Sequence, residues 1–187
     1  MDLTAITAGM AEHWHIWLIS AVLIVAAVID GIALKVPNWL TFAMILSGWA
    51  YSGITGSWLG LGYSLLGTFV GLMLLFVLHL VGGMGGGDVK LLAGIGAWLH
   101  TVHVLNIFTA TAILGGVMAV LMIARGGRWA HHWRQARQIV IEWFTVRDAD
   151  KLYEIAAERK PTMMLLPYGI PMTIAALGYF AYCGMYF

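Results

Sequence analysis

Near the middle of the chain lies the stretch Gly82-Gly83-Met84-Gly85-Gly86-Gly87-Asp88-Val89-Lys90. It closes a run from Val36 to Gly87 that contains no Asp, Glu, Lys or Arg. An ionisable side chain at the edge of so apolar a segment is costly to place in lipid, and it indicates a functional site. Glycines adopt backbone conformations that other residues avoid, so this stretch can interrupt a helix and line a polar crevice at membrane depth. We therefore expect a hinge that presents one acid, Asp88.

The composition predicts the class of protein. Of 187 residues, 61% are hydrophobic and only 10% are charged, whereas a soluble domain carries about 25% charged residues. Because one membrane crossing needs about 20 apolar residues, the uncharged runs divide by length into six spans. We expect an all-α, polytopic membrane protein with a single membrane domain and transmembrane helices at about 13–30, 38–52, 58–81, 88–104, 107–124 and 163–186.

The segment 125–160, between the fifth and sixth spans, contains eight of the ten basic residues. Its apolar residues recur at spacings of three and four, which is typical of an amphipathic helix lying at the membrane interface. Lys and Arg favour the cytoplasmic side. With six spans and both termini outside, Lys35, Lys90 and the 125–160 loop all lie in the cytoplasm. This topology also brings Asp30 and Asp88 to the cytoplasmic edge of the membrane.

Asp30 and Asp88 are the only acids between Glu12 and Glu142. Two carboxyl groups in one site of low dielectric constant hold one proton between them and can divide the acid and base roles. The ionised group takes a proton from water that attacks a peptide carbonyl, while the protonated group donates to the carbonyl oxygen. This is the chemistry of an aspartic protease, and it requires neither a metal nor a cofactor.

Other interpretations of the two acids remain open at this point. Asp88 after a glycine-rich loop is a good helix N-cap, and Asp30 can be a solvated residue paired with Lys35. Paired acids in a helix bundle also serve proton relays, so a proton-coupled transporter or channel is the alternative from another functional class. Relay acids usually lie near the membrane midplane, whereas these two are expected at one edge. A non-catalytic membrane scaffold is a third possibility.

Further motifs indicate no additional chemistry. The glycine run does not match a phosphate-binding loop, because Asp88 and Val89 separate it from Lys90 and no hydroxyl residue follows, so we expect neither nucleotide nor nucleic acid as a partner. The pairs His131-His132 and His100-x-x-His103 have possible metal-ligand spacing but are more typical of an interfacial surface. Cys183 is the single cysteine, which excludes a disulfide framework.

Two sequence patterns together resemble a known family. Gly85-Gly86-Gly87-Asp88 reads as Gly-x-Gly-Asp and is followed by Val89-Lys90, and Asp30 lies seven residues before Pro37-Asn38. With Leu166-Pro167-Tyr168-Gly169 at the start of the last span, the chain resembles the type IV prepilin peptidases, particularly the short forms of tight-adherence (Flp-type) pilus systems. Presenilin and signal-peptide peptidase share Gly-x-Gly-Asp, and a protease of that group is the alternative within the same class.

The resemblance implies an intramembrane aspartic endopeptidase of the bacterial inner membrane. Such an enzyme cuts the basic leader from a prepilin or pseudopilin at the cytoplasmic face, just before the apolar helix of that substrate, and its two acids would be Asp30 and Asp88 here. The supporting or substrate-binding residues that we expect around them are Gly85, Gly86, Gly87, Lys90, Lys35, Pro37 and Asn38. The two lysines either bind acidic groups of the substrate, adjust the acids or extend to lipid headgroups. Larger members also methylate the new amino terminus through a chain with a cysteine-rich domain, so this sequence gives no basis for methyltransferase activity. The sequence does not indicate the oligomeric state.

Overall fold

The computed structural model describes residues 12–80, 84–126 and 166–186, together with Arg134, Arg137, Gln138, Ile141 and Thr145. In this described part every regular element is helical, and the helices are α2 (Trp14–Ala33), α3 (Asn38–Leu80), α4 (Gly86–Gly126) and α7 (Gly169–Tyr182). The expectation of an all-helical fold is therefore confirmed. Most of the expected interfacial helix in 125–160 lies outside the described residues.

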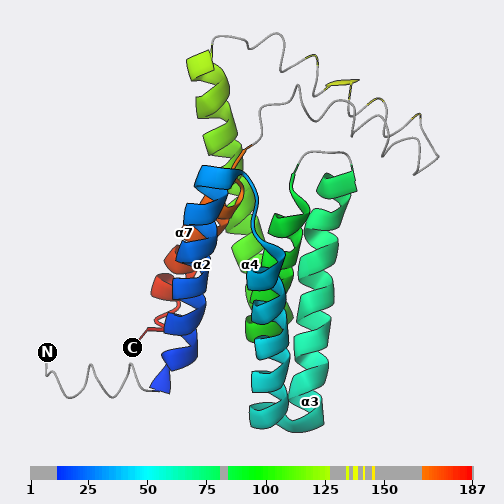
Figure 1. Cartoon of the computed structure of the whole chain (residues 1–187), viewed down its shortest axis with the longest axis vertical. Helices are drawn as coiled ribbons and strands as arrows, with labels where there is room; N and C mark the ends of the chain where they lie inside the picture. Colours follow the sequence, from blue (N-terminus) through cyan, green and yellow to red (C-terminus); the bar gives the residue numbers. More distant parts are fainter. Residues whose placement is uncertain are drawn as a thin grey trace, which may run out of the picture.

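Two of the helices reverse direction at a single residue. Ser57 in α3 has φ 55° and ψ −155°, and His100 in α4 has φ 63° and ψ −175°. Positive φ is uncommon for residues other than glycine. Figure 1 shows the two halves of α3 side by side, and the indole Nε1 of Trp49 donates a 2.9 Å hydrogen bond across them to the Thr68 hydroxyl. α3 and α4 are therefore two helical hairpins rather than two long rods.

The reversal in α4 differs in position from the expected gap between residues 104 and 107. It occurs at His100, and residues 101–126 form the outgoing helix. His100 is held there by α3, because its Nε2 lies 3.4 Å from the Ser52 hydroxyl and its ring lies 6.1 Å from the ring of Tyr63. His100 is the first residue of the polar stretch 100–106, where the sequence favours a break, and the membrane boundaries at 88–104 and 107–124 stay a prediction.

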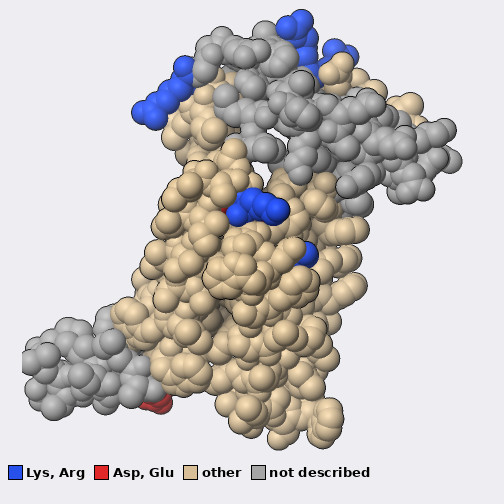
Figure 2. All heavy atoms as spheres, in the orientation of Figure 1, with Lys and Arg blue, Asp and Glu red and all other residues tan. Residues whose placement is uncertain are grey.

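The described helices have the length and surface of membrane helices. Three of them contain stretches that are long and apolar enough to span a bilayer: Trp14–Ala33, Asn38–Phe76 and Gly86–Arg125. Large apolar side chains are widely exposed, including Ile32, Ile54 and Trp58, which are 83%, 84% and 88% exposed. Contiguous exposed apolar surface of this kind indicates contact with lipid. In Figure 2 the Lys and Arg side chains lie in the upper and middle part of the visible face, above a wide uncharged region.

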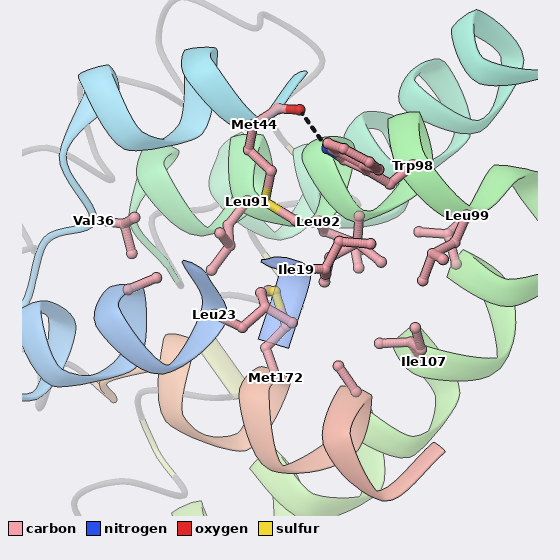
Figure 3. Packing of buried hydrophobic residues seen from close by; sticks show 14 of the residues in the cluster. Ile19, Leu23, Val36, Met44, Leu91, Leu92, Trp98, Leu99, Ile107 and Met172 are labelled. Atoms are coloured by element: carbon pink, nitrogen blue, oxygen red, sulfur yellow. Dashed lines mark hydrogen bonds between the residues drawn. The ribbon is translucent and has the colours of Figure 1, made fainter. Parts of the chain in front are cut away.

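The first half of α4 lies at the centre of the bundle. Its residues Leu91, Leu92 and Ile95 have no exposed surface, and they pack with buried residues of the other helices, including Ile19 of α2 and Met172 of α7. Figure 3 shows Leu91 and Leu92 of α4 together with Ile19 and Met172, which come from different helices.

Helix contacts explain how the ends of α2, α4 and α7 come together. α3 packs most extensively on α4, and α7 contacts both α4 and α2, whereas α2 and α3 touch only slightly. The amino-terminal end of α7 meets the carboxyl-terminal end of α2, where the amide of Gly169 bonds to the side chain of Asp30. This junction forms one wall of the candidate site.

Candidate active site

A cavity of about 340 Å³ lies where α2 ends and α4 begins. It contains both acids of the sequence analysis, the three glycines before Asp88, both lysines and Asn38. Its lining residues are Asp30, Leu34, Lys35, Val36, Asn38, Met84, Gly85, Gly86, Gly87, Asp88, Lys90 and Leu166. The fold therefore brings together residues that are separated by more than fifty positions in the chain.

Asp30 occupies the last turns of α2 and is 2% exposed. Its Oδ2 accepts a 2.8 Å hydrogen bond from the backbone N–H of Gly169, at the start of α7. The first N–H groups of a helix have no partners within that helix, and they carry a partial positive charge that suits a carboxylate. The interpretation of Asp30 as a solvated residue paired with Lys35 is therefore wrong, because its carboxyl is buried and its partner is Gly169.

Asp88 lies in the first turn of α4 and is 5% exposed. Its Oδ2 faces Gly85, on which an added Cβ would lie 3.2 Å from that oxygen, while its Oδ1 is buried without a hydrogen-bond partner. α4 begins at Gly86, so Asp88 is the third residue of the helix rather than its N-cap residue, and its side chain is turned back toward Gly85. A buried carboxyl oxygen without a partner requires an explanation, and a catalytic role is one of the few available. Asp88 is also close enough to Asp30 for their charges to interact.

The glycines before Asp88 allow close approach of the chain. A Cβ on Gly87 would lie 2.6 Å from the carbonyl oxygen of Val36, in the segment between α2 and α3. A Cβ on Gly86 would lie 3.3 Å from the ring of His79, whose Nδ1 is 3.1 Å from the carbonyl oxygen of Met84. With Nδ1 as donor, His79 ties the end of α3 to the loop that leads to Asp88. Sequence analysis did not identify this contact.

The remaining expected site residues divide into two groups. Lys90 donates a 2.9 Å hydrogen bond to Oδ1 of Asn38 and lies 4.9 Å from the ring centre of Phe42, so it ties α4 to the start of α3. Lys35 lines the cavity with an exposed side chain. Pro37 is not a lining residue. Its carbonyl oxygen accepts hydrogen bonds from the amides of the first turn of α3, so its role is to begin that helix.

The start of α7 contributes residues that the sequence did not identify as part of a site. A Cβ on Gly169 would lie 3.0 Å from Oδ2 of Asp30, so only glycine allows this approach without displacement. Tyr168 lies near enough to Asp88 to be affected by its charge, and its ring packs against Gly115. The signal in the sequence is the stretch Leu166-Pro167-Tyr168-Gly169, which contributes to the family resemblance and in which Pro167 suits the beginning of a helix.

The pair His100 and His103 does not line this cavity. His103 Nδ1 lies 2.9 Å from the hydroxyl of Tyr179, at the opposite end of the bundle, and His131-His132 falls outside the described residues. In the ranges 12–80, 84–126 and 166–186, no group of three or more His, Cys, Asp or Glu side chains is arranged to hold a metal ion.

Comparison with known proteins gives the family. Residues 17–120 match the type IV leader peptidase family, and this range is more than half of the chain and includes both acids. The chain belongs to the type IV leader peptidase family. The matched range ends before α7, so the contact between Gly169 and Asp30 lies partly outside the leader peptidase match.

Several curated leader peptidases are similar to this chain, and each is called prepilin leader peptidase/N-methyltransferase. The protein of Pectobacterium carotovorum subsp. carotovorum is 31% identical over 127 residues, which cover 64% of this chain and 44% of that protein. The protein of Aeromonas hydrophila is 30% identical over 129 residues, with the same coverage. That of Neisseria gonorrhoeae is 28% identical over 144 residues, covering 68% of this chain and 50% of that protein. The chain thus spans half or less of the length of these relatives, and no solved structure matches it.

Proposed function

We propose that this chain is an intramembrane aspartic endopeptidase that removes the basic leader of a prepilin or pseudopilin at the cytoplasmic face of the bacterial inner membrane. The observation that carries the proposal is the shared cavity of Asp30 and Asp88, in which both carboxyl groups are buried and one oxygen of Asp88 has no partner. Membership of the leader peptidase family and the names of the relatives support the same reaction.

The hydrogen bonds suggest how the two acids divide the work. Asp30 accepts a hydrogen bond from the backbone amide of Gly169, and such a bond favours the ionised form of a carboxyl group. One oxygen of Asp88 is turned toward the backbone N–H of Gly85, and the other is buried without a partner, which suits a protonated group that can donate to the substrate. Asp30 is therefore the general base in our proposal, and Asp88 is the general acid.

The reaction then needs only these two groups and water. Asp30 takes a proton from a water molecule, whose oxygen bonds to the carbonyl carbon of the scissile peptide, while Asp88 gives its proton to the carbonyl oxygen. The resulting diol collapses as the C–N bond breaks. Asp88 recovers a proton from one hydroxyl, and Asp30 gives its proton to the leaving amine. Both acids return to their starting states, and the products are a carboxylic acid and an amine.

The topology in this proposal has six membrane crossings, with both termini outside. It assigns 14–33, the two halves of α3, the two halves of α4 and the segment containing α7 to one crossing each. The reversals at Ser57 and His100 support six crossings. Lys35 and Lys90 line the same cavity as the two acids, which supports a cytoplasmic location for the cavity under the positive-inside rule. The 125–160 loop belongs to this cytoplasmic side.

Our proposal covers the peptidase step alone. The names of the relatives include methyl transfer as a second activity, but the proton transfers described for Asp30 and Asp88 supply no methyl group. Prepilin or pseudopilin substrates and the surrounding lipid are the partners that the proposal requires.

The deciding experiment is co-expression of a candidate prepilin with the parent chain or with Asp30→Asn or Asp88→Asn. Each change keeps the size of the side chain but removes its ability to exchange a proton, so we expect leader cleavage to fall by at least about 1,000-fold. Glu12→Gln is the matched control, since Glu12 is an exposed acid at the start of the described chain. Cleavage at the parental rate by either catalytic variant would contradict the proposal.

A further inference from the structure

A second cavity, of about 190 Å³, lies between α2 and the first half of α3. It is lined by Leu18, Ile19, Val22, Leu40, Ala43, Met44, Ser47 and Trp98. Only Ser47 and Trp98 carry side-chain donors, and both donate to the carbonyl oxygen of Met44, at 3.1 and 2.9 Å. Figure 3 shows the bond from Trp98 to the carbonyl oxygen of Met44. Because both side-chain donors already have a partner, a bound group would find no hydrogen-bond donor in the cavity. The cavity therefore suits an apolar group.

The cavity has a buried floor and an open side. Ile19, Met44 and Trp98 are 1%, 4% and 6% exposed, whereas Leu18 and Ala43 on the rim are exposed. α2 and α3 make only slight contact, because α2 is supported by α7 and α3 by α4. A partner can therefore enter this seam from the lipid without separating the main helix pairs.

The apolar cavity and the candidate active site are separate cavities that lie along the same two helices. On α2, Ile19 and Val22 share a helix face with Asp30. They precede Asp30 by eleven and eight residues. On α3, Asn38 lines the active-site cavity and Leu40 lines the apolar one. At 1.5 Å rise per residue, the apolar cavity lies between about 12 Å and about 18 Å from Asp30 along α2.

We infer that the seam between α2 and α3 is the docking groove for the apolar helix that follows the cleaved bond of the substrate. This inference rests on the proposed function, which supplies a substrate with a basic leader and an apolar helix. When the scissile bond lies between Asp30 and Asp88, a helix running along the seam brings its residues about 8 to 12 positions after that bond to the cavity. Ala43, on the rim, then contacts the substrate.

Photocrosslinking tests this placement without requiring cleavage. The photoreactive residue p-benzoylphenylalanine replaces Ala43 in an Asp88→Asn background, and the same residue replaces Ala112, an exposed alanine of α4, as the control. We expect a crosslink from position 43 to the apolar helix of co-expressed prepilin, within about 8 to 12 residues of the cleavage site, and none from position 112. Crosslinks to lipid alone, to the leader, or equally from both positions would overturn the inference.

A steric test separates docking from catalysis. Ala43→Trp fills the groove from its rim, whereas Ala112→Trp places the same bulk on a distant lipid-facing surface. For Ala43→Trp we expect kcat/KM to fall at least about 10-fold for full-length prepilin and to stay unchanged for a short peptide that ends just after the scissile bond. Equal effects on the two substrates would overturn the proposal of a docking groove but would not bear on the proposed protease function. If prepilin crosslinks at position 43 but the parent chain cleaves neither substrate, the proposed protease function is contradicted, whereas the proposed docking groove is supported.

Discussion

The backbone amide of Gly169 donates a 2.8 Å hydrogen bond to the carboxyl group of Asp30, across 139 positions of the chain. This contact makes the start of α7 part of the candidate active site, although α7 lies beyond the residues that match the leader peptidase family. It fixes the orientation of one acid, while Asp88 keeps an oxygen free. The last described helix therefore supports one of the two acids.

Gly169→Ala tests the importance of this contact. The new Cβ would lie 3.0 Å from Oδ2 and 3.1 Å from Cβ of Asp30, so the carboxyl group must move and its hydrogen bond must lengthen. We expect kcat/KM for leader cleavage to fall by about 10- to 100-fold, or about 1.4 to 2.7 kcal/mol in transition-state stabilisation. Gly178→Ala on the same helix is the control, since its Cβ meets nothing within 4 Å. Equal activities of the two variants would argue against a positioning role for Gly169.

The sequence revealed the acids but not their support. Asp30 and Asp88 stand out because each interrupts a long apolar run, and this anomaly is visible in any reading of charge along the chain. The amide of Gly169 has no such signature, because every residue except proline carries one and its partner is set only by tertiary packing. The reversal at Ser57 falls between the expected spans 38–52 and 58–81, but hydropathy does not single out the turning residue there or at His100, since both take positive φ without being glycine.

Gly87→Ala and Gly62→Ala should change stability in opposite directions. At Gly87 the new Cβ would lie 2.6 Å from the carbonyl oxygen of Val36, so the segment before α3 must be displaced, at a cost of about 1 to 3 kcal/mol. Gly62 is exposed within α3 and its Cβ meets nothing within 4 Å, so alanine should stabilise that helix by up to about 1 kcal/mol. Thermal unfolding in detergent measures both, with Tm lower for the first variant and equal or higher for the second. A Gly87→Ala protein as stable as the parent would show that this close approach is not required.

His79→Phe removes the hydrogen bond to the Met84 carbonyl and keeps an aromatic ring beside Gly86. Since a net hydrogen bond contributes about 0.5 to 1.5 kcal/mol, we expect a 2- to 10-fold loss, roughly, in kcat through looser positioning of Asp88. His103→Phe removes a bond of similar length to Tyr179 at the other end of the bundle, and it should leave kcat unchanged. Steady-state cleavage assays compare the two variants. A similar loss in both would indicate a general effect on stability rather than positioning of the loop.

The single cysteine provides a direct test of the proposed topology. Cys183 is exposed and lines a cavity with His13 and His100, at the end of the bundle opposite to Asp30 and Asp88. If the two acids lie at the cytoplasmic edge, Cys183 lies outside the inner membrane. A membrane-impermeant maleimide should therefore label Cys183 in spheroplasts. In a Cys183→Ser background, Lys35→Cys should be labelled only after the membrane is permeabilised, because Lys35 is exposed beside the active-site cavity. The reverse labelling pattern would contradict the proposed topology, because it would place both acids at the outer face of the membrane. The positive-inside rule does not favour that location for Lys35 and Lys90.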